Sequence, residues 1–177
     1  MASIATQASY LISAALLSAP ALLGQSGNWA WKEYVYSRDG FAIMFPLAPA
    51  RAQDPHNHSI SMYTIHFSVD SGLTLRVDHG KRDCAATLEA LKLGALQNNQ
   101  SQQPIKPSSV REVSLGKYPG LEYEFRSDTA HLVYDRFYCV DGRFYTFTAQ
   151  WRVGQPRPAA VNRTIESFRI SKANSSK

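Results

Sequence analysis

Apolar and polar residues alternate with a period of two in several segments of this chain, which is the pattern of half-buried β-strands. A strand is predicted first at Phe41–Phe45, where Phe41, Ile43 and Phe45 alternate with Ala42 and Met44; it follows a turn signal at residues 38–40 and is stopped by Pro46. The same pattern predicts six further strands, at residues 60–69, 73–79, 110–115, 121–125, 130–140 and 143–151. Between the first two strands, residues 47–58 contain two prolines, and we expect a loop there.

Two segments have the spacing of helices instead of strands. The first begins at Asp83, which can cap it, and we expect it to extend to about Asn99. Its apolar face consists of Leu88, Leu91 and Ala95. The second begins at Pro158, which fits the first turn of a helix. Its apolar stripe consists of Val161, Thr164, Ile165 and Phe168. Strands with two helices packed on them predict an α+β fold with a mainly antiparallel sheet.

Asp141-Gly142 is the clearest hairpin signal in the chain, because a type I′ turn needs positive φ at both central residues. A two-residue loop there pairs Val140 with Arg143. The register that follows pairs Leu132 with Trp151, Tyr134 with Ala149, Arg136 with Phe147, and Tyr138 with Tyr145.

Two loops compete for the preceding turn: three residues at 127–129, or two residues at 128–129. We prefer the two-residue loop, which pairs Phe125 with Leu132. It gathers one apolar face from Leu121, Tyr123, Phe125, Leu132, Tyr134, Phe147 and Trp151. It leaves the polar side chains of Glu122, Glu124, Asp135 and Gln150 on the other face. A slip by one residue would undo this separation.

The N-terminus carries an apolar stretch, Tyr10–Gly24, that is too short for a transmembrane helix but fits the core of a secretory signal peptide. We therefore expect a leader over residues 1–24, cleaved after Ala21 or Gly24, and a mature form without a transmembrane segment. No Lys or Arg precedes the apolar stretch, so the terminal amine alone supplies the positive charge of this leader. Export predicts a periplasmic or secreted protein.

The chain of 177 residues has a length typical of one domain, which we place at residues 29–171, followed by a flexible tail at 172–177. Its formal net charge is +5, but the basic residues are scattered among acidic ones and never form a run of five. This distribution is typical of a solvated basic surface, and we do not expect a nucleic-acid partner.

Several short segments resemble parts of a known group of exported proteins. Residues 40–46 (GFAIMFP), preceded by Tyr34 and Tyr36, resemble the opening strand of PsbP-like and related exported bacterial α/β/α sandwich domains. Residues 118–122 (YPGLE) resemble a turn of the same group. A late pattern also resembles it: Arg136, Tyr138, Val140, Gly142, Arg143, Tyr145, Ser167 and Phe168.

This resemblance implies an antiparallel sheet between helices, an accessory or binding role, and no shared catalytic residue. The alternative fold is a helix on a curved antiparallel sheet, as in cystatin-like and NTF-like proteins. We expect an exported, non-enzymatic binding or accessory module of the bacterial cell envelope, with an unknown protein or small ligand as its partner. The alternative is an exported, hydrolase-type enzyme with a site assembled from scattered residues.

Histidines do not predict a metal site. His56 and His58 flank one residue of a loop, but two ligands are too few for a structural zinc site. His66 and His79 lie on neighbouring strands, roughly 10–13 Å apart along the hairpin at about 3.3 Å per residue. The chain also lacks a glycine-rich phosphate loop or a nucleotide fingerprint, so we expect no cofactor.

The two cysteines, Cys84 and Cys139, have no recognisable protease or redox context. In an oxidising compartment they form a disulfide if their Cα atoms come close enough. Otherwise they are small buried apolar residues. His131 shares a strand face with Cys139 but lies eight residues away, too far for a nucleophile–base hydrogen bond.

Arg136 is the sharpest candidate for binding, because the predicted register places it on the apolar face among tyrosines. The candidate ligand-binding residues are Arg136, Tyr134, Tyr138 and Tyr145. In this hypothesis the planar guanidinium binds an anion or a carboxylate between aromatic walls. The competing interpretation is a structural arginine that stacks on a ring or extends past the edge of the core.

Overall fold

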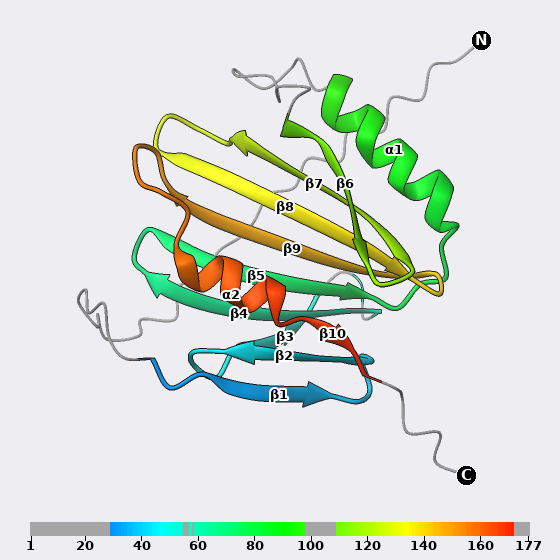
Figure 1. Cartoon of the computed structure of the whole chain (residues 1–177), viewed down its shortest axis with the longest axis horizontal. Helices are drawn as coiled ribbons and strands as arrows, with labels where there is room; N and C mark the ends of the chain where they lie inside the picture. The colour runs from blue at the N-terminus through cyan, green and yellow to red at the C-terminus, as the bar shows by residue number, and fades with distance from the viewer. Residues whose placement is uncertain (1–28, 55–56, 58, 98–108, 172–177) are drawn as a thin grey trace.

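The computed structural model describes residues 29–54, 57, 59–97 and 109–171 (Figure 1). Its main element is a seven-stranded antiparallel sheet in the order β3-β4-β5-β9-β8-β7-β6. These strands are β3 (Ala50–Gln53), β4 (Ile60–Ser68), β5 (Ser71–Asp78), β6 (Arg111–Leu115), β7 (Tyr118–Arg126), β8 (His131–Val140) and β9 (Arg143–Arg152). The predicted α+β class with a mainly antiparallel sheet is confirmed.

Two further layers lie on opposite faces of this sheet. A small sheet is formed by β1 (Lys32–Tyr36), β2 (Phe41–Phe45) and β10 (Arg169–Ile170), and it lies beside helix α2 (Ala159–Glu166) (Figure 1). We call the face that they cover the inner face. Helix α1 (Cys84–Gln97) packs against β7 and β8 on the opposite side, the outer face.

The inner face carries the main hydrophobic core. From the large sheet it buries Tyr63, Ile65, Leu73, Leu75, Val77, Tyr134, Tyr138, Tyr145, Phe147, Ala149 and Trp151. From the covering layer it buries Phe41, Ile43, Phe45, Val161, Ile165 and Phe168. Phe168 lies at its centre, with its ring centroid 5.0 Å from that of Phe147 and 5.3 Å from that of Tyr145. Each such side chain stabilises the fold by about 1.5–3 kcal/mol, so these rings hold the layers together.

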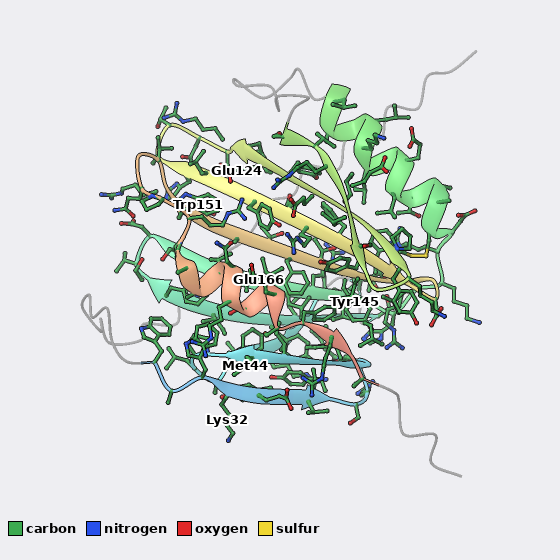
Figure 2. The ribbon with its side chains drawn as sticks, viewed as in Figure 1. Lys32, Met44, Glu124, Tyr145, Trp151 and Glu166 are labelled. Carbon is green, nitrogen blue, oxygen red and sulfur yellow. A yellow bond between two sulfur atoms is a disulfide. The ribbon has the colours of Figure 1, made fainter. Side chains whose placement is uncertain are left out.

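Helix α1 begins as predicted and covers a smaller apolar cluster. The backbone N–H of Ala86 donates to Asp83 Oδ1 at 3.1 Å, which is the expected cap. The cluster beneath the helix contains Leu121, Phe137, Cys139 and Phe144, with Cys84, Leu88 and Leu91 packed against it. A disulfide between Cys84 and Cys139 ties the first residue of the helix to β8; it is the yellow bond in Figure 2. The sheet is therefore apolar on both faces here.

The β8–β9 hairpin is confirmed in full. Val140 pairs with Arg143, and the four predicted pairs from Leu132–Trp151 to Tyr138–Tyr145 all form. Asp141 and Gly142 have φ values of 51° and 85°, as a type I′ turn requires.

The predicted register between β7 and β8 is wrong. Phe125 pairs with Val133 instead of Leu132, so neither of the two loops that we considered, at 127–129 or at 128–129, is correct. The side chain of Asp128 stabilises a turn that we did not predict: its Oδ1 accepts the backbone N–H groups of Ala130 at 2.6 Å and His131 at 2.7 Å. The slip moves Glu122 and Glu124 to the inner face, and Glu122 now lies opposite Arg136.

The pattern also missed three short strands. Residues 47–58 were predicted as a loop but contain β3, whose four residues are all exposed, so the strand has no buried face. Strand β1 and the two-residue β10 had no strand prediction either.

Some predictions fall on residues outside the described part of the chain: the leader at 1–24 with its cleavage positions, the tail at 172–177, and both His56 and His58. Among the described residues, no helix is both long enough and apolar enough to cross a bilayer.

Candidate functional site

A buried carboxylate, Glu122, organises the charged part of the inner face. Strand pairing places it opposite Arg111 of β6 and Arg136 of β8, and only 3% of its surface is exposed. Arg111 Nη2 lies 2.5 Å from Oε1, and Arg136 Nη2 lies 2.5 Å from Oε2. Oε2 also accepts Arg136 Nε at 2.7 Å and the hydroxyl of Tyr134. Both carboxylate oxygens are thus bound by donors from neighbouring strands.

These donors keep Glu122 ionised despite its burial. Burial by itself raises the pKa of Glu122, but the hydrogen bonds from Tyr134 and Arg136, with the charges of Arg136 and Arg111, outweigh it and lower that pKa. Burial, and the hydrogen bond to Glu122, raise the pKa of the Tyr134 hydroxyl. The cluster is therefore a fixed arrangement of a carboxylate, two guanidiniums and a neutral phenol.

Arg157 forms an adjoining wall and comes from the connection between β9 and α2. Its guanidinium carbon lies 3.8 Å from the ring centroid of Tyr134 and 5.5 Å from that of Trp151. Its Nη2 also lies 2.9 Å from Oε2 of Glu124. Figure 2 shows Glu124 and Trp151 toward the same end of the large sheet, away from Tyr145. Arg157 thus fastens the segment before α2 to the sheet.

These groups line a partly open pocket of about 260 Å³, which we call the charged pocket. Its lining residues are Ser109, Arg111, Glu122, Tyr123, Glu124, Tyr134 and Arg157. The volume is slightly below the roughly 300–1,000 Å³ that is typical of small-molecule sites. It suits one side chain or a small organic molecule.

The structure brings only part of the predicted ligand-binding set to this pocket. Tyr134 lines it, and Arg136 lies directly behind Glu122. Tyr138 adjoins Arg136, whose Nη1 donates to its hydroxyl at 3.3 Å. Tyr145 is 1% exposed and donates its hydroxyl to the backbone oxygen of Asp39 at 2.8 Å, away from the pocket.

Sequence reasoning missed four charged residues of this site: Arg111, Glu122, Glu124 and Arg157. A usable signal was present for Glu122. A buried arginine requires an acidic partner, and β7 supplies two glutamates beside the strand of Arg136. The wrong register placed both of them on the opposite face. We found no comparable signal for Arg157, which reaches the site from a loop.

A second buried carboxylate, Asp39, lies in the turn between β1 and β2 and is 1% exposed. Its Oδ2 accepts the hydroxyl of Tyr63 and lies 3.5 Å from Arg51 Nη2. His79 Nε2 lies 3.1 Å from Oδ1, in a contact that lacks hydrogen-bond alignment. Arg143 Nη1 donates to the backbone oxygen of Asp39 at 2.9 Å.

The Asp39 cluster contains a serine and a histidine, but not in a nucleophile–base–acid chain. Ser61 Oγ lies 3.3 Å from His79 Nε2, which is the same ring nitrogen that faces Asp39. In a hydrolytic triad the serine and the acid contact opposite nitrogens of the imidazole.

The cysteine and histidine candidates of the sequence lie apart from each other. Cys139 is bound to Cys84, and His131 Nδ1 lies 3.0 Å from Asp128 Oδ2 at the β7–β8 turn. His66 pairs with Gly72 near the β4–β5 turn, while His79 lies beyond the other end of that hairpin. Within the described ranges, no three His, Cys, Asp or Glu side chains are grouped to hold a metal ion.

Solved structures with a similar fold include the following two. The chain is similar to the solution structure of cyanobacterial PsbP (CyanoP) from Synechocystis sp. PCC 6803, with a TM-score of 0.55 at 11% identity. That match covers 83% of this chain and 96% of the other. A crystal structure from Bacteroides thetaiotaomicron VPI-5482 gives a TM-score of 0.50 at 10% identity, over 80% of this chain and 48% of the other. This chain thus spans about half the length of the second protein.

No protein-family model matches the chain, and no curated protein matches it. At these identities the likeness concerns the fold. The PsbP-like resemblance, first seen in short segments of sequence, is confirmed at that level, as is the sandwich of helices and antiparallel sheet.

Proposed function

We propose that this chain is an exported, non-enzymatic binding or accessory module of the bacterial cell envelope, and that it binds a protein or small ligand at the charged pocket. The observation that carries the proposal is the convergence of Arg111, Glu124, Tyr134 and Arg157 around an open space of about 260 Å³. Convergent polar groups with an aromatic wall are the usual components of a binding site.

Two features support export to the periplasm or beyond the cell. The Cys84–Cys139 disulfide suits an oxidising compartment, because such bonds are rare in cytosolic proteins. The apolar stretch Tyr10–Gly24 has the length of a signal-peptide core.

The absence of catalytic activity is supported by how the reactive groups are used. The Glu122 carboxylate is bound by three donor side chains, which leaves it poorly suited to act as a general base. Cys139 is bound in the disulfide, and Ser61 shares one imidazole nitrogen with Asp39.

The alternative, an exported hydrolase-type enzyme, has one observation in its favour: Ser61, His79 and Asp39 lie together. It requires the imidazole to rotate so that each partner meets a different nitrogen. Turnover of an ester or peptide substrate by the secreted protein, lost in His79→Gln, would overturn the proposal of a binding module.

The pocket is tested by ligand-induced thermal stabilisation with small acids, amines, sugars and short peptides. A true ligand stabilises the wild type and Arg152→Gln but not Arg157→Gln. Arg152 is the matched control, because it pairs with Asp70 on the surface, at 3.3 Å, and does not line the pocket. Stabilisation that is equal in all three proteins would place the binding site elsewhere. Mass spectrometry of the secreted protein checks both leader cleavage and the disulfide.

A further inference from the structure

The charged pocket carries an excess of positive charge. Three guanidiniums, those of Arg111, Arg136 and Arg157, meet two carboxylates, those of Glu122 and Glu124. One positive charge is therefore left without a partner within the cluster. A cleft with low-dielectric walls concentrates the field of such a charge and attracts anions.

The uncompensated charge is presented to solvent by Arg111. Arg136 is 22% exposed and holds Oε2 of Glu122 with two of its nitrogens. Arg157 is 24% exposed, pairs with Glu124 and stacks on Tyr134. Arg111 is 66% exposed, although its Nη2 stays 2.5 Å from Oε1 of Glu122. That contact orients its planar group at the mouth of the pocket.

The same count of charges limits the ligand. A single negative charge neutralises the cluster, whereas a dianion would leave a net negative charge beside Glu124. The volume of about 260 Å³ excludes a large molecule but accommodates an acidic side chain or a small organic acid. A carboxylate matches the donor geometry of a guanidinium.

We propose that the charged pocket binds one singly charged carboxylate, from a free organic acid or from an acidic side chain of a peptide, and that Arg111 is the residue that binds it. The inference rests on the proposed function and names the ligand class of that site. It also transfers the anion-binding role from Arg136, which Glu122 engages through two nitrogens, to the more exposed Arg111 on the edge strand β6, which Glu122 contacts through one.

The experiment is an NMR titration of the secreted full-length mature protein, followed at the arginine Nε–Hε signals and at the amides around Tyr134. The probes are acetate, N-acetylglutamate amide, the isosteric N-acetylglutamine amide, inorganic phosphate and tetramethylammonium, at constant ionic strength. We expect saturable shifts with the first two probes, with Kd on the order of 1 mM, and none with the neutral amide. Acetate alone would indicate a free acid as the ligand, and preference for the blocked amino acid would indicate a peptide.

Variants locate the site. Arg111→Gln is expected to weaken carboxylate binding about tenfold or more, as for loss of a charged hydrogen bond. Arg111→Lys keeps the charge beside Glu122 and is expected to bind with intermediate affinity. Arg152→Gln is the control, with unchanged affinity. If Arg111→Gln does not fold, the wild-type shift at the Arg111 Nε–Hε signal decides.

Carboxylate binding that is unchanged in Arg111→Gln, or no shift at Arg111 in the wild type, would overturn the inference. Tighter binding of phosphate than of acetate would overturn the preference for a single charge. Saturable binding of tetramethylammonium in the pocket would overturn the inference that the ligand is a carboxylate. It would not contradict the proposal that the protein is a binding module. Substrate turnover that depends on His79 would instead remove the proposed function.

Discussion

Two buried carboxylates, Glu122 on the inner face and Asp39 in the layer that covers it, are stabilised in different ways. Glu122 meets two guanidiniums within hydrogen-bond distance and a tyrosine hydroxyl. Asp39 is equally buried, but the arginine nitrogen nearest to its carboxylate lies 3.5 Å away, and the other partners of that carboxylate are Tyr63 and His79. Glu122 is therefore compensated by permanent charges, whereas Asp39 lies beside a titratable imidazole whose pKa is lowered by burial.

This difference assigns the two sites different properties. A carboxylate held by arginines stays charged and fixed, which is what a preformed binding pocket needs. When a carboxylate lies beside a histidine, the charge next to it changes with pH, because the imidazole titrates. The Asp39 cluster joins the β1–β2 turn to β4 and β9 through Tyr63 and Arg143, so that change acts on the contact between the two sheets.

The largest expected effect comes from removing the main partner of Glu122. Arg136→Met leaves Arg111 as the one guanidinium beside the buried Glu122 carboxylate and is expected to lower the free energy of unfolding by about 3–5 kcal/mol. Urea denaturation measures it. The double variant Arg136→Met/Glu122→Met should recover most of this loss, because it also removes the Glu122 carboxylate. A double variant less stable than the single one would show that the pair itself stabilises the fold.

Asp39→Asn is expected to cost less, about 1–3 kcal/mol, because an amide oxygen still accepts the Tyr63 hydroxyl while the contacts to Arg51 and His79 weaken. The same variant should lower the pKa of His79 further, because the charge of Asp39 raises it. Urea denaturation and an NMR titration of the imidazole give both values. A rise in the pKa of His79 would contradict an electrostatic contact between the imidazole and the Asp39 carboxylate.

Arg157→Gln removes the stacking on Tyr134 and the ion pair with Glu124. The free energy of unfolding is expected to fall by about 1 kcal/mol, because Arg157 is partly exposed in the wall of the pocket. Thermal denaturation, with Arg152→Gln as a control of similar chemistry, separates this loss from a general effect of charge. A loss in Arg152→Gln as large as that in Arg157→Gln would remove the special role of the stacked arginine.

The smallest effect concerns pH. Burial lowers the pKa of His79, aided by the charges of Arg143 and Arg38, and these outweigh the opposite effect of Asp39 and Asp78. The unfolded chain therefore takes up this proton first, so the His79 contribution to stability falls as pH falls below about 6.5. Glu122, whose pKa is lowered, loses its contribution only below about pH 4.5.

The test compares stability at pH 7 and pH 5 in the wild type and in His79→Gln. Asp135 acts in the opposite direction in this window, because burial raises its pKa to about 6 and the folded state then binds the extra proton. The difference between the two proteins isolates His79: the variant should lose less stability on acidification. An equal loss in both would exclude His79 as the source.

The sequence predicted the elements better than the pairing between them. The β8–β9 hairpin was predictable because Asp141-Gly142 admits one turn type and so one register. The β7–β8 register was not, because we assumed that one face of the sheet is apolar and the other polar. Leu121 and Phe137 pack under α1 on the outer face, while Glu122 is buried on the inner face. Where both faces are buried, alternation does not identify the core side.

The same error hid the candidate site. Arg136 was singled out as an unusual residue, but its partner depends on a register that a short-range pattern does not determine. Arg157 reaches Tyr134 from a distant part of the chain, so no local signal links the two.

The strand order has a consequence for how the molecule assembles. The last long strand in sequence, β9, lies between β5 and β8, so the large sheet is completed by the addition of a central strand. Until β9 is in place, β3-β4-β5 and β8-β7-β6 are separate half-sheets, each with an open edge that can pair with another chain. Folding of this sheet therefore waits for contacts between residues far apart in sequence, which is the condition for slow folding. A chain that ends before Arg143 would lack β9. It would consist of the two half-sheets, each with an open edge, joined by α1 and its connections.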